Sequence, residues 1–286
     1  MKQLALVAVL FLAGCGSFGP SQPHSLSLAF KAGDTYKYKY HATSKQTAGM
    51  SGMTIPIEID MTASETVTVK SVDASGVADL SIVLSDFSLK TVSGGVTNTT
   101  TGLPSNSVDV KIHGDGTVVS INGGDLMAGS PLAAFAGVGG GYFIAAVLPD
   151  HSVKVGDTWS KTYDQKDPNG SAAVHITSSS KYLRDETMNG VTAAVVETKS
   201  DGTLRMTGPM GAASTPASGP AINGTFTTDV TTWVDPDGHR IMKAHSTATD
   251  DLTINLPSVS ATDQSPIATQ GPLTAKGQAT TDLTPA

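Results

Sequence analysis

The sequence predicts a mainly β fold. Two duplicated antiparallel β units form a curved open sheet or half-barrel, or else a sandwich, with one or two short helices between them. Apolar and polar residues alternate along many segments, which is typical of half-buried antiparallel strands. Clusters of Gly, Pro and Asp separate these segments, as turns do. A short motif and its surroundings also occur twice along the chain.

The first β unit is predicted over residues 28–125. Its alternating apolar positions are Tyr36, Tyr38, Tyr40, Ile55, Ile57, Ile59, Met61, Ala63, Val67, Val69, Val108, Val110 and Ile112. The sequence Gly114-Asp115-Gly116 fits a tight hairpin. Glu65 interrupts the apolar alternation, so it lies either at a sheet edge or in polar contact within a cavity. Of these alternatives, we favour the edge.

An almost wholly apolar segment, residues 126–149, connects the two units. Pro131 and the run Gly139-Gly140-Gly141 disfavour a membrane-spanning helix here. We expect one or two short helices that cover an apolar sheet face. The alternative is a segment that lines a ligand site or touches a membrane.

The second β unit, predicted over residues 150–256, repeats features of the first. The motif Lys31-Ala32-Gly33-Asp34-Thr35-Tyr36 matches Lys154-Val155-Gly156-Asp157-Thr158-Trp159. Three further pairs match: Tyr40 with Tyr163, Gly76-Val77 with Gly190-Val191, and Asp115-Gly116 with Asp237-Gly238. Alternation continues at Val191, Ala193, Val195, Phe226, Thr228, Val230, Thr232 and Val234. We infer two copies of one unit. The final segment, residues 257–286, is rich in Ser, Thr and Pro, and residues 273–283 fit one further strand at a sheet edge.

Composition argues against several classes of function. Charged residues make up 15% of the chain, the net charge is −7 and there is no basic run, so we expect no nucleic-acid partner. The motifs of serine hydrolases, zinc proteases and phosphate-binding loops are absent, so we expect no enzyme, no cofactor and no metal. Asp250 and Asp251 could bind a cation, but adjacent strand residues point in opposite directions. We therefore expect a solvated loop end there.

The N-terminus has the pattern of a secretory signal. Lys2 precedes an apolar run over residues 4–12, and Leu12-Ala13-Gly14-Cys15 follows. This string resembles the lipobox of bacterial lipoproteins. The resemblance implies cleavage between Gly14 and Cys15, removal of residues 1–14, and a lipid on Cys15 that holds the protein on a membrane of the cell envelope. Gly16 implies the outer membrane if the organism has two membranes. Residues 15–27 would then be a flexible tether.

The aromatic side chains suggest where a ligand could bind. Core packing is one interpretation of them, and an apolar cavity is the other. The candidate lining residues are Tyr36, Tyr38, Phe135, Phe143, Trp159 and Trp233. The strand pattern and the hairpin at residues 233–238 resemble secreted β-rich lipoproteins and, distantly, the half-barrels of lipoprotein carriers such as LolA and LolB. We therefore expect a non-enzymatic binding or structural module of the envelope, with an envelope protein or a hydrophobic ligand as partner. A carrier of lipid is the alternative.

Overall fold

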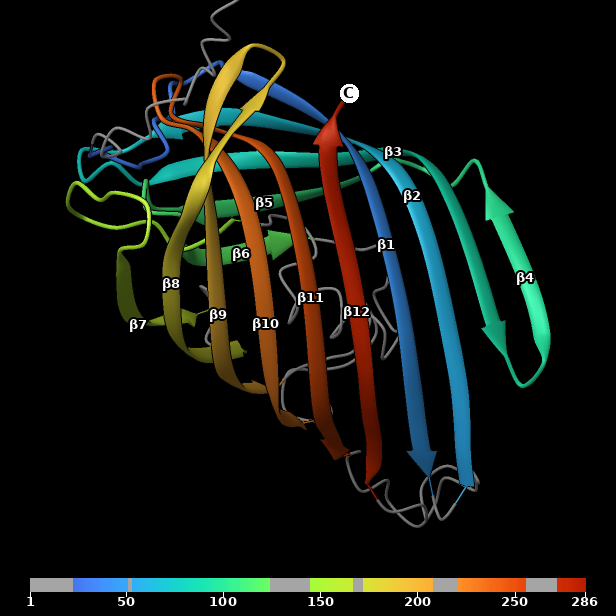
Figure 1. The fold of residues 1–286 in the computed structure, drawn as a ribbon. Coiled ribbons are helices and arrows are strands. Elements are labelled where there is room, and N and C mark those ends of the chain that lie inside the picture. The colour runs from blue at the N-terminus through green and yellow to red at the C-terminus, as the bar shows by residue number, and fades with distance from the viewer. Residues whose placement is uncertain (1–22, 51–52, 124–144, 167–171, 208–220, 256–271) are drawn as a thin grey trace, which may run out of the picture.

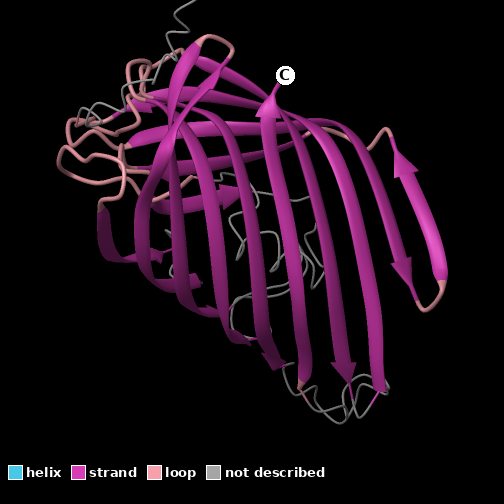
Figure 2. Ribbon diagram, viewed as in Figure 1, coloured by secondary structure: helices cyan, strands magenta, loops and turns pink. Residues whose placement is uncertain are grey.

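The structure, a computed structural model, describes residues 23–50, 53–123, 145–166, 172–207, 221–255 and 272–286. These residues form strands and loops, and no helix occurs among them (Figure 2). The strands are β1 (Thr35–Met50), β2 (Met53–Val72), β3 (Ala78–Ser93), β4 (Val96–Thr101), β5 (Asn106–Ile112), β6 (Val118–Gly123), β7 (Thr158–Lys166), β8 (Ala172–Met188), β9 (Val191–Thr207), β10 (Ala221–Asp235), β11 (Arg240–Asn255) and β12 (Leu273–Pro285).

All the strands belong to one antiparallel sheet that curls into a nearly closed barrel shape. The order is β6-β5-β3-β2-β1-β12-β11-β10-β9-β8-β7, and β4 pairs only with β3. Strands β6 and β7 approach each other at a seam without forming a ladder (Figure 1). The predicted curved half-barrel is confirmed, and the alternative sandwich of two sheets is not formed. The helices expected between the units fall mainly on residues 126–144, outside the described residues, and residues 145–148 are not helical.

The two predicted units are five-stranded meanders that run the same way round the sheet. One comprises β1, β2, β3, β5 and β6, and the other comprises β7 to β11. The matched motifs make the same turn before the first strand of each meander, with φ of 92° at Gly33 and 98° at Gly156. In both turns the Gly amide donates to a carbonyl on the second strand, at 2.9 and 2.8 Å. The matched segments thus occupy corresponding places, while an origin by duplication stays a prediction.

Strand β12 joins the two meanders, because it pairs with β1 on one side and β11 on the other. The C-terminal segment therefore does supply a strand, but the expectation that it lies at an edge is wrong. Which neighbours a strand takes depends on the whole sheet, and alternation within the strand carries no information about that. The strands at the margins are β6, β7 and β4, and all residues of β4 are exposed.

The inner face of the sheet, which lines the barrel, carries the main core. Its buried residues come from both meanders and from β12, and include Tyr38, Val67, Ile82, Tyr182 and Leu283. The predicted alternation is confirmed along β2, where Ala63, Val67 and Val69 face inward. Three irregularities in register, at Thr62/Ser64, Tyr182/Arg184 and Trp233/Val234, help to bend the long strands around this core.

The chain before β1 packs against this barrel. Leu26 and Leu28 are 1% and 5% exposed, and His24 and Val153 exchange two backbone hydrogen bonds of 2.8 and 2.9 Å. The expectation of a flexible tether over residues 15–27 is therefore wrong from residue 23 onward. Two leucines spaced to enter a core were the signal for this in the sequence. Residues 1–22, with the predicted signal and Cys15, lie outside the described part.

Candidate functional site

The upper part of the barrel, near the turns that contain Gly33 and Gly238, is filled by side chains. Tyr38 is 8% exposed and donates a 2.8 Å hydrogen bond from its hydroxyl to the carbonyl of Ile241. Beside it, Tyr36 is half-buried and helps to line a cavity of about 20 Å³. A space of that size has room for about one water molecule. Around Tyr36 and Tyr38, the described residues therefore leave no room for a ligand larger than water.

Residues 145–148, the end of the apolar connection, run through the barrel against its inner face. The amides of Ala146 and Val147 donate to the hydroxyls of Thr232 and Thr198, at 2.8 and 3.0 Å. Trp159 Nε1 donates to the carbonyl of Val147 at 2.8 Å. These hydrogen bonds satisfy a backbone that is cut off from water, since Ala146 is 0% exposed and Val147 3%. This part of the connection is a fixed piece of the barrel interior.

A belt of hydroxyls crosses the inner face below this segment. Ser178 and Ser200 lie 2.9 Å apart, and Ser180 and Thr198 lie 2.8 Å apart. All four residues are buried. The belt separates the main core from a second apolar cluster nearer the lower rim, where β1 ends and β2 begins. That lower cluster contains Ile176, Leu204, Ile222, Phe226, Leu252, Ile254 and Ala275.

One row of register partners crosses the inner face at the level of the lower cluster. It runs from Ile57 through Gln46, Gly277, Asp250, Phe226 and Gly202 to Ile176. The two glycines leave space for their neighbours, because a Cβ at Gly277 would collide with Gln46 and one at Gly202 with Phe226. Gln46 therefore reaches across Gly277, and its Nε2 donates to Asp250 Oδ1 at 3.2 Å.

This pair leaves two buried acceptors without a donor among the described residues, Gln46 Oε1 and Asp250 Oδ2. Gln46 is 4% exposed. Burial raises the pKa of the Asp250 carboxyl, the hydrogen bond from Gln46 lowers it and the charge of Asp251 raises it further. The expected loop end is wrong, since Asp250 and Asp251 lie within β11. Asp250 faces inward, and Asp251 instead pairs with Lys276 at 2.7 Å.

The inner face of β2 becomes more exposed toward the lower rim. Val67 and Glu65 are each 1% exposed and Ala63 is 8%, whereas Ile55 is 43% exposed. Between them, Ile57, Ile59 and Met61 are half-buried. These four residues, Ile55, Ile57, Ile59 and Met61, are called the isoleucine wall below. It is an apolar surface on the barrel side of the sheet that described residues cover only in part.

Glu65 lies in the upper core, not at a sheet edge, so the favoured interpretation is wrong. It pairs in register with Tyr38 and Leu84, and neither of its carboxyl oxygens has a hydrogen-bond partner among the described residues. Burial raises the pKa of this carboxyl to about 8. Alternation predicts which face a residue occupies, but whether that face is covered depends on the rest of the sheet.

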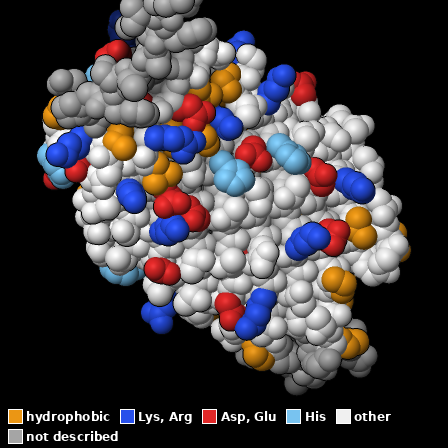
Figure 3. All heavy atoms as spheres, viewed as in Figure 1, with side chains coloured by type: hydrophobic (Ala, Val, Ile, Leu, Met, Phe, Trp, Pro, Cys, Tyr) orange, Lys and Arg blue, Asp and Glu red, His pale blue; other side chains and the backbone are white. Residues whose placement is uncertain are grey.

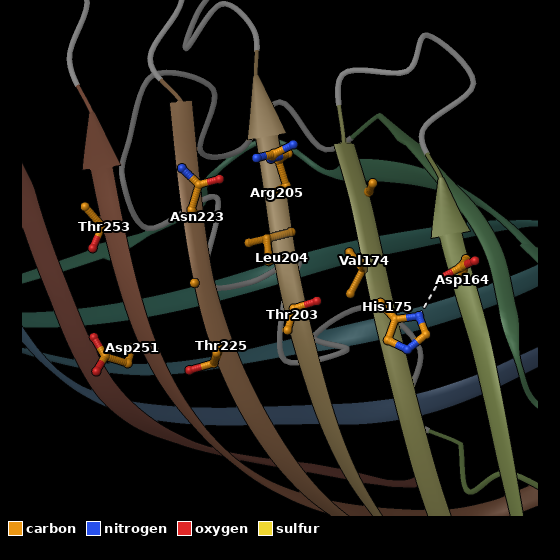
Figure 4. A pocket seen from close by; sticks show the side chains of 12 residues that line it. Asp164, Val174, His175, Thr203, Leu204, Arg205, Asn223, Thr225, Asp251 and Thr253 are labelled. Atoms are coloured by element: carbon orange, nitrogen blue, oxygen red, sulfur yellow. Dashed lines mark hydrogen bonds and ion pairs between the residues drawn. The ribbon is translucent and has the colours of Figure 1, made fainter.

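The outer face of the sheet carries a second hollow, at the lower ends of β7 to β11 (Figure 4). It measures about 680 Å³ and is lined mainly by polar side chains, among them Asp164, His175, Thr203, Arg205, Asn223 and Thr225. His175 Nδ1 and Asp164 Oδ1 lie 2.8 Å apart. Among the described residues that line it, no side-chain nitrogen or oxygen is buried without a hydrogen-bond partner. The hollow is an open polar groove.

Away from the groove, charged side chains are spread over the face seen in Figure 3. Acidic and basic side chains are interspersed over it and no patch of one sign stands out in this view (Figure 3). Cross-strand pairs such as His41 with Asp60 at 3.1 Å and His245 with Asp282 at 2.8 Å account for part of this pattern.

The predicted lining residues separate into three groups. Tyr36, Tyr38 and Trp159 contact the main core. Trp233 is 8% exposed but lies on the other side of the sheet, in a small cluster with Ala193, Val195 and Met242, under Lys243 Nζ at 4.5 Å from the ring. Phe135 and Phe143 lie outside the described residues, as do Gly14 and Cys15. Sequence reasoning missed Gln46 and set Asp250 aside as a loop end, although Gly277 inside a strand was a signal of close approach.

Comparisons with known proteins do not identify a family for this chain. No protein family and no curated protein matches the chain. A solved structure, a DUF1329 family protein from Desulfovibrio piger, aligns over 84% of this chain and 83% of its own, with 7% identity and a TM-score of 0.16. That similarity is too low to carry an argument. Within the described residues there is no cluster of three or more His, Cys, Asp or Glu side chains arranged for a metal, and no helix suited to crossing a membrane.

Proposed function

We propose that this protein is a lipid-anchored protein of the bacterial envelope that binds an apolar ligand inside its curved sheet, at the lower rim. The observation that carries the proposal is the isoleucine wall. Soluble proteins bury contiguous apolar surface unless it binds something. On the inner face of β2, Val67 is buried, whereas Ile55 on the same strand is exposed to solvent.

The opposite wall supports this proposal. The lower cluster on β8 to β12 lies at the same level of the sheet, since Gln46 on β1 lies between Ile57 and the row that contains Phe226. Its residues are already buried, so the exposed part of the site is the isoleucine wall. A hydrocarbon chain on the isoleucine wall would bury apolar surface there at roughly 25 cal/mol per Å². The filled upper core would set the depth to which such a chain enters. A structural module of the envelope is the alternative, and it requires no ligand at the isoleucine wall.

Binding of a neutral fluorescent probe, N-phenyl-1-naphthylamine, tests this proposal. Protein carrying Cys15→Ser avoids acyl chains that would compete with the probe. We expect saturable binding that weakens about tenfold with Ile57→Gln, since a half-buried apolar contact becomes polar. The control is Glu58→Gln, one residue away on the outer face. Absence of saturable binding, or equal effects of the two variants, would favour the structural module.

The anchor is a separate part of the proposal and rests on the Leu12-Ala13-Gly14-Cys15 string. Two acyl chains give stable membrane attachment where one is marginal. We expect Cys15→Ser to prevent lipidation and cleavage, so that the protein leaves the detergent phase on Triton X-114 partition and migrates as a larger chain. Identical partition and migration of the two proteins would contradict the anchor.

A further inference from the structure

The pair formed by Gln46 and Asp250 has features of a ligand site that the apolar walls alone do not explain. Both side chains face inward from different meanders, and they meet only because Gly277 between them has no side chain. Their single mutual hydrogen bond uses one Gln46 N–H and one Asp250 oxygen. A buried acceptor without a donor costs roughly 1–3 kcal/mol. Here two such acceptors adjoin one another.

The chemistry of this pair selects the kind of group that would complete it. An amide oxygen and a carboxylate oxygen accept hydrogen bonds only, so the missing group is a donor. A carboxylate away from water also favours a positive charge beside it. The basic residues that adjoin Gln46 and Gly277 along their strands, Lys45 and Lys276, lie on the outer face. They pair there with Glu58 and Asp251. On the inner face, Lys161 pairs with Asp115.

The position of the pair joins it to the proposed apolar site. Gln46 is the register partner of Ile57, in the middle of the isoleucine wall, and Asp250 is the register partner of Phe226 in the lower cluster. We propose that Gln46 and Asp250 bind the positively charged, hydrogen-bond-donating head of an amphiphile, whose hydrocarbon chain lies along the isoleucine wall. This inference rests on the proposed function and adds the class of ligand to it. An alkylammonium ion is the simplest such molecule, because its head has three donors.

Competition against the neutral probe tests the inference. On the Cys15→Ser background, dodecylammonium and dodecanoate are each titrated below their micelle-forming concentrations. The two ions have chains of the same length and heads of opposite charge. We expect dodecylammonium to displace the probe at a concentration at least about tenfold lower than dodecanoate does. One charge-assisted hydrogen bond contributes enough binding free energy for such a difference.

The variant Asp250→Asn should remove this preference while the neutral probe still binds. The matched control is Asp251→Asn, the adjacent residue on the outer face, which should keep the preference. A second variant, Gly277→Ala, displaces Gln46 without altering a charge and should also weaken dodecylammonium binding. Weaker dodecylammonium binding by Gly277→Ala would show that Gln46 and Asp250 bind the head group together.

The outcomes separate the inference from the proposed function. Probe binding without a preference for dodecylammonium, or a preference that Asp250→Asn leaves intact, overturns the inference alone. Absence of probe binding contradicts the proposed function. Calorimetry with hexylammonium then decides the inference, because it needs no long chain. Heat of binding that Asp250→Asn abolishes supports the head-group site, and no such heat overturns it.

Discussion

Glu65 shows how strongly a single residue depends on the sheet around it. Its carboxyl is surrounded by the main core and holds its proton up to a pH of about 8, because burial disfavours the charged form. In the unfolded chain the same group has the ordinary value of 4.5. The raised pKa therefore stabilises the fold fully below about pH 4.5. This contribution is lost as the pH rises to about 8.

Replacing Glu65 by Gln should make the free energy of unfolding depend less on pH. Between the two pKa values of 4.5 and about 8, the free energy of unfolding should fall by on the order of 5 kcal/mol. We expect urea denaturation between pH 5 and pH 8.5 to show that Glu65→Gln gains stability relative to the wild type as the pH rises. Glu58→Gln, on the outer face of the same strand, is the control and should run parallel to the wild type. If the Glu65→Gln curve also ran parallel, the carboxyl would not be buried as described.

Individual site residues were the hardest part to predict from the sequence. Alternation along β1 and β11 places Gln46 and Asp250 on defined faces of their strands. Their contact, however, spans 204 positions and requires β12 to pass between them. No local pattern contains that information. Trp233 was grouped with Trp159 for the same reason, since matching strands do not show which side of a sheet is the inside.

At the scale of elements, two turns with the same backbone conformation have different surroundings. Gly116 has a φ of 82° and Gly190 a φ of 81°. A Cβ at Gly116 would lie 2.5 Å from the carbonyl oxygen of Ala146, inside the barrel, whereas a Cβ at Gly190 would meet nothing within 4 Å. The Gly116 turn thus also positions residues 145–148.

Alanine at these two glycines should separate backbone strain from packing. Gly190→Ala should cost about 1 kcal/mol, the usual cost of a left-handed residue with a Cβ. Gly116→Ala should cost clearly more, because Ala146 must move and its hydrogen bond to Thr232 weakens. Thermal denaturation of both variants measures the difference. Equal losses would mean that residues 145–148 do not pack against the turn.

Strand β12 holds the two meanders together, although the sequence suggested an edge. Thr280 has register partners on both sides, Thr43 and Thr247, while Thr97 in β4 has only Val92. Proline removes a ladder hydrogen bond and is tolerated mainly at edges. We expect Thr280→Pro to yield little folded protein and Thr97→Pro to cost much less, as measured by circular dichroism and solubility. Comparable tolerance at both positions would contradict the central place of β12.

The strands themselves could be predicted well, and their arrangement could not. Period-two alternation identified the inward faces of β1, β2, β5 and β10, and the turns at residues 114–116 and 235–238 lie where Gly, Asp and Pro indicated. The choice between one curved sheet and two packed sheets depends on contacts between residues far apart in sequence. The repeated motif gave a partial guide, because it located the first strand of each meander.

For the molecule as a whole, the curvature of the sheet buries the apolar face that a second sheet would cover in a sandwich. A sheet with one apolar face must bury that face against something. Here the long strands bend round and the inner face covers itself over the upper half. Toward the lower rim the two walls are apolar and β2 is only partly covered, and this leaves the place where we propose that a ligand binds.

Photo-crosslinking tests this central claim most directly. A dodecylammonium analogue with a diazirine in its chain is bound to the Cys15→Ser protein, irradiated, and its adducts are located by peptide mass spectrometry. The account predicts saturable adducts on the inward residues Ile55, Ile57 and Ile59, reduced by Asp250→Asn, with none on the outward Glu58. Adducts concentrated in the outer groove, at Thr203 and Arg205, or adducts that do not saturate, would contradict binding inside the sheet.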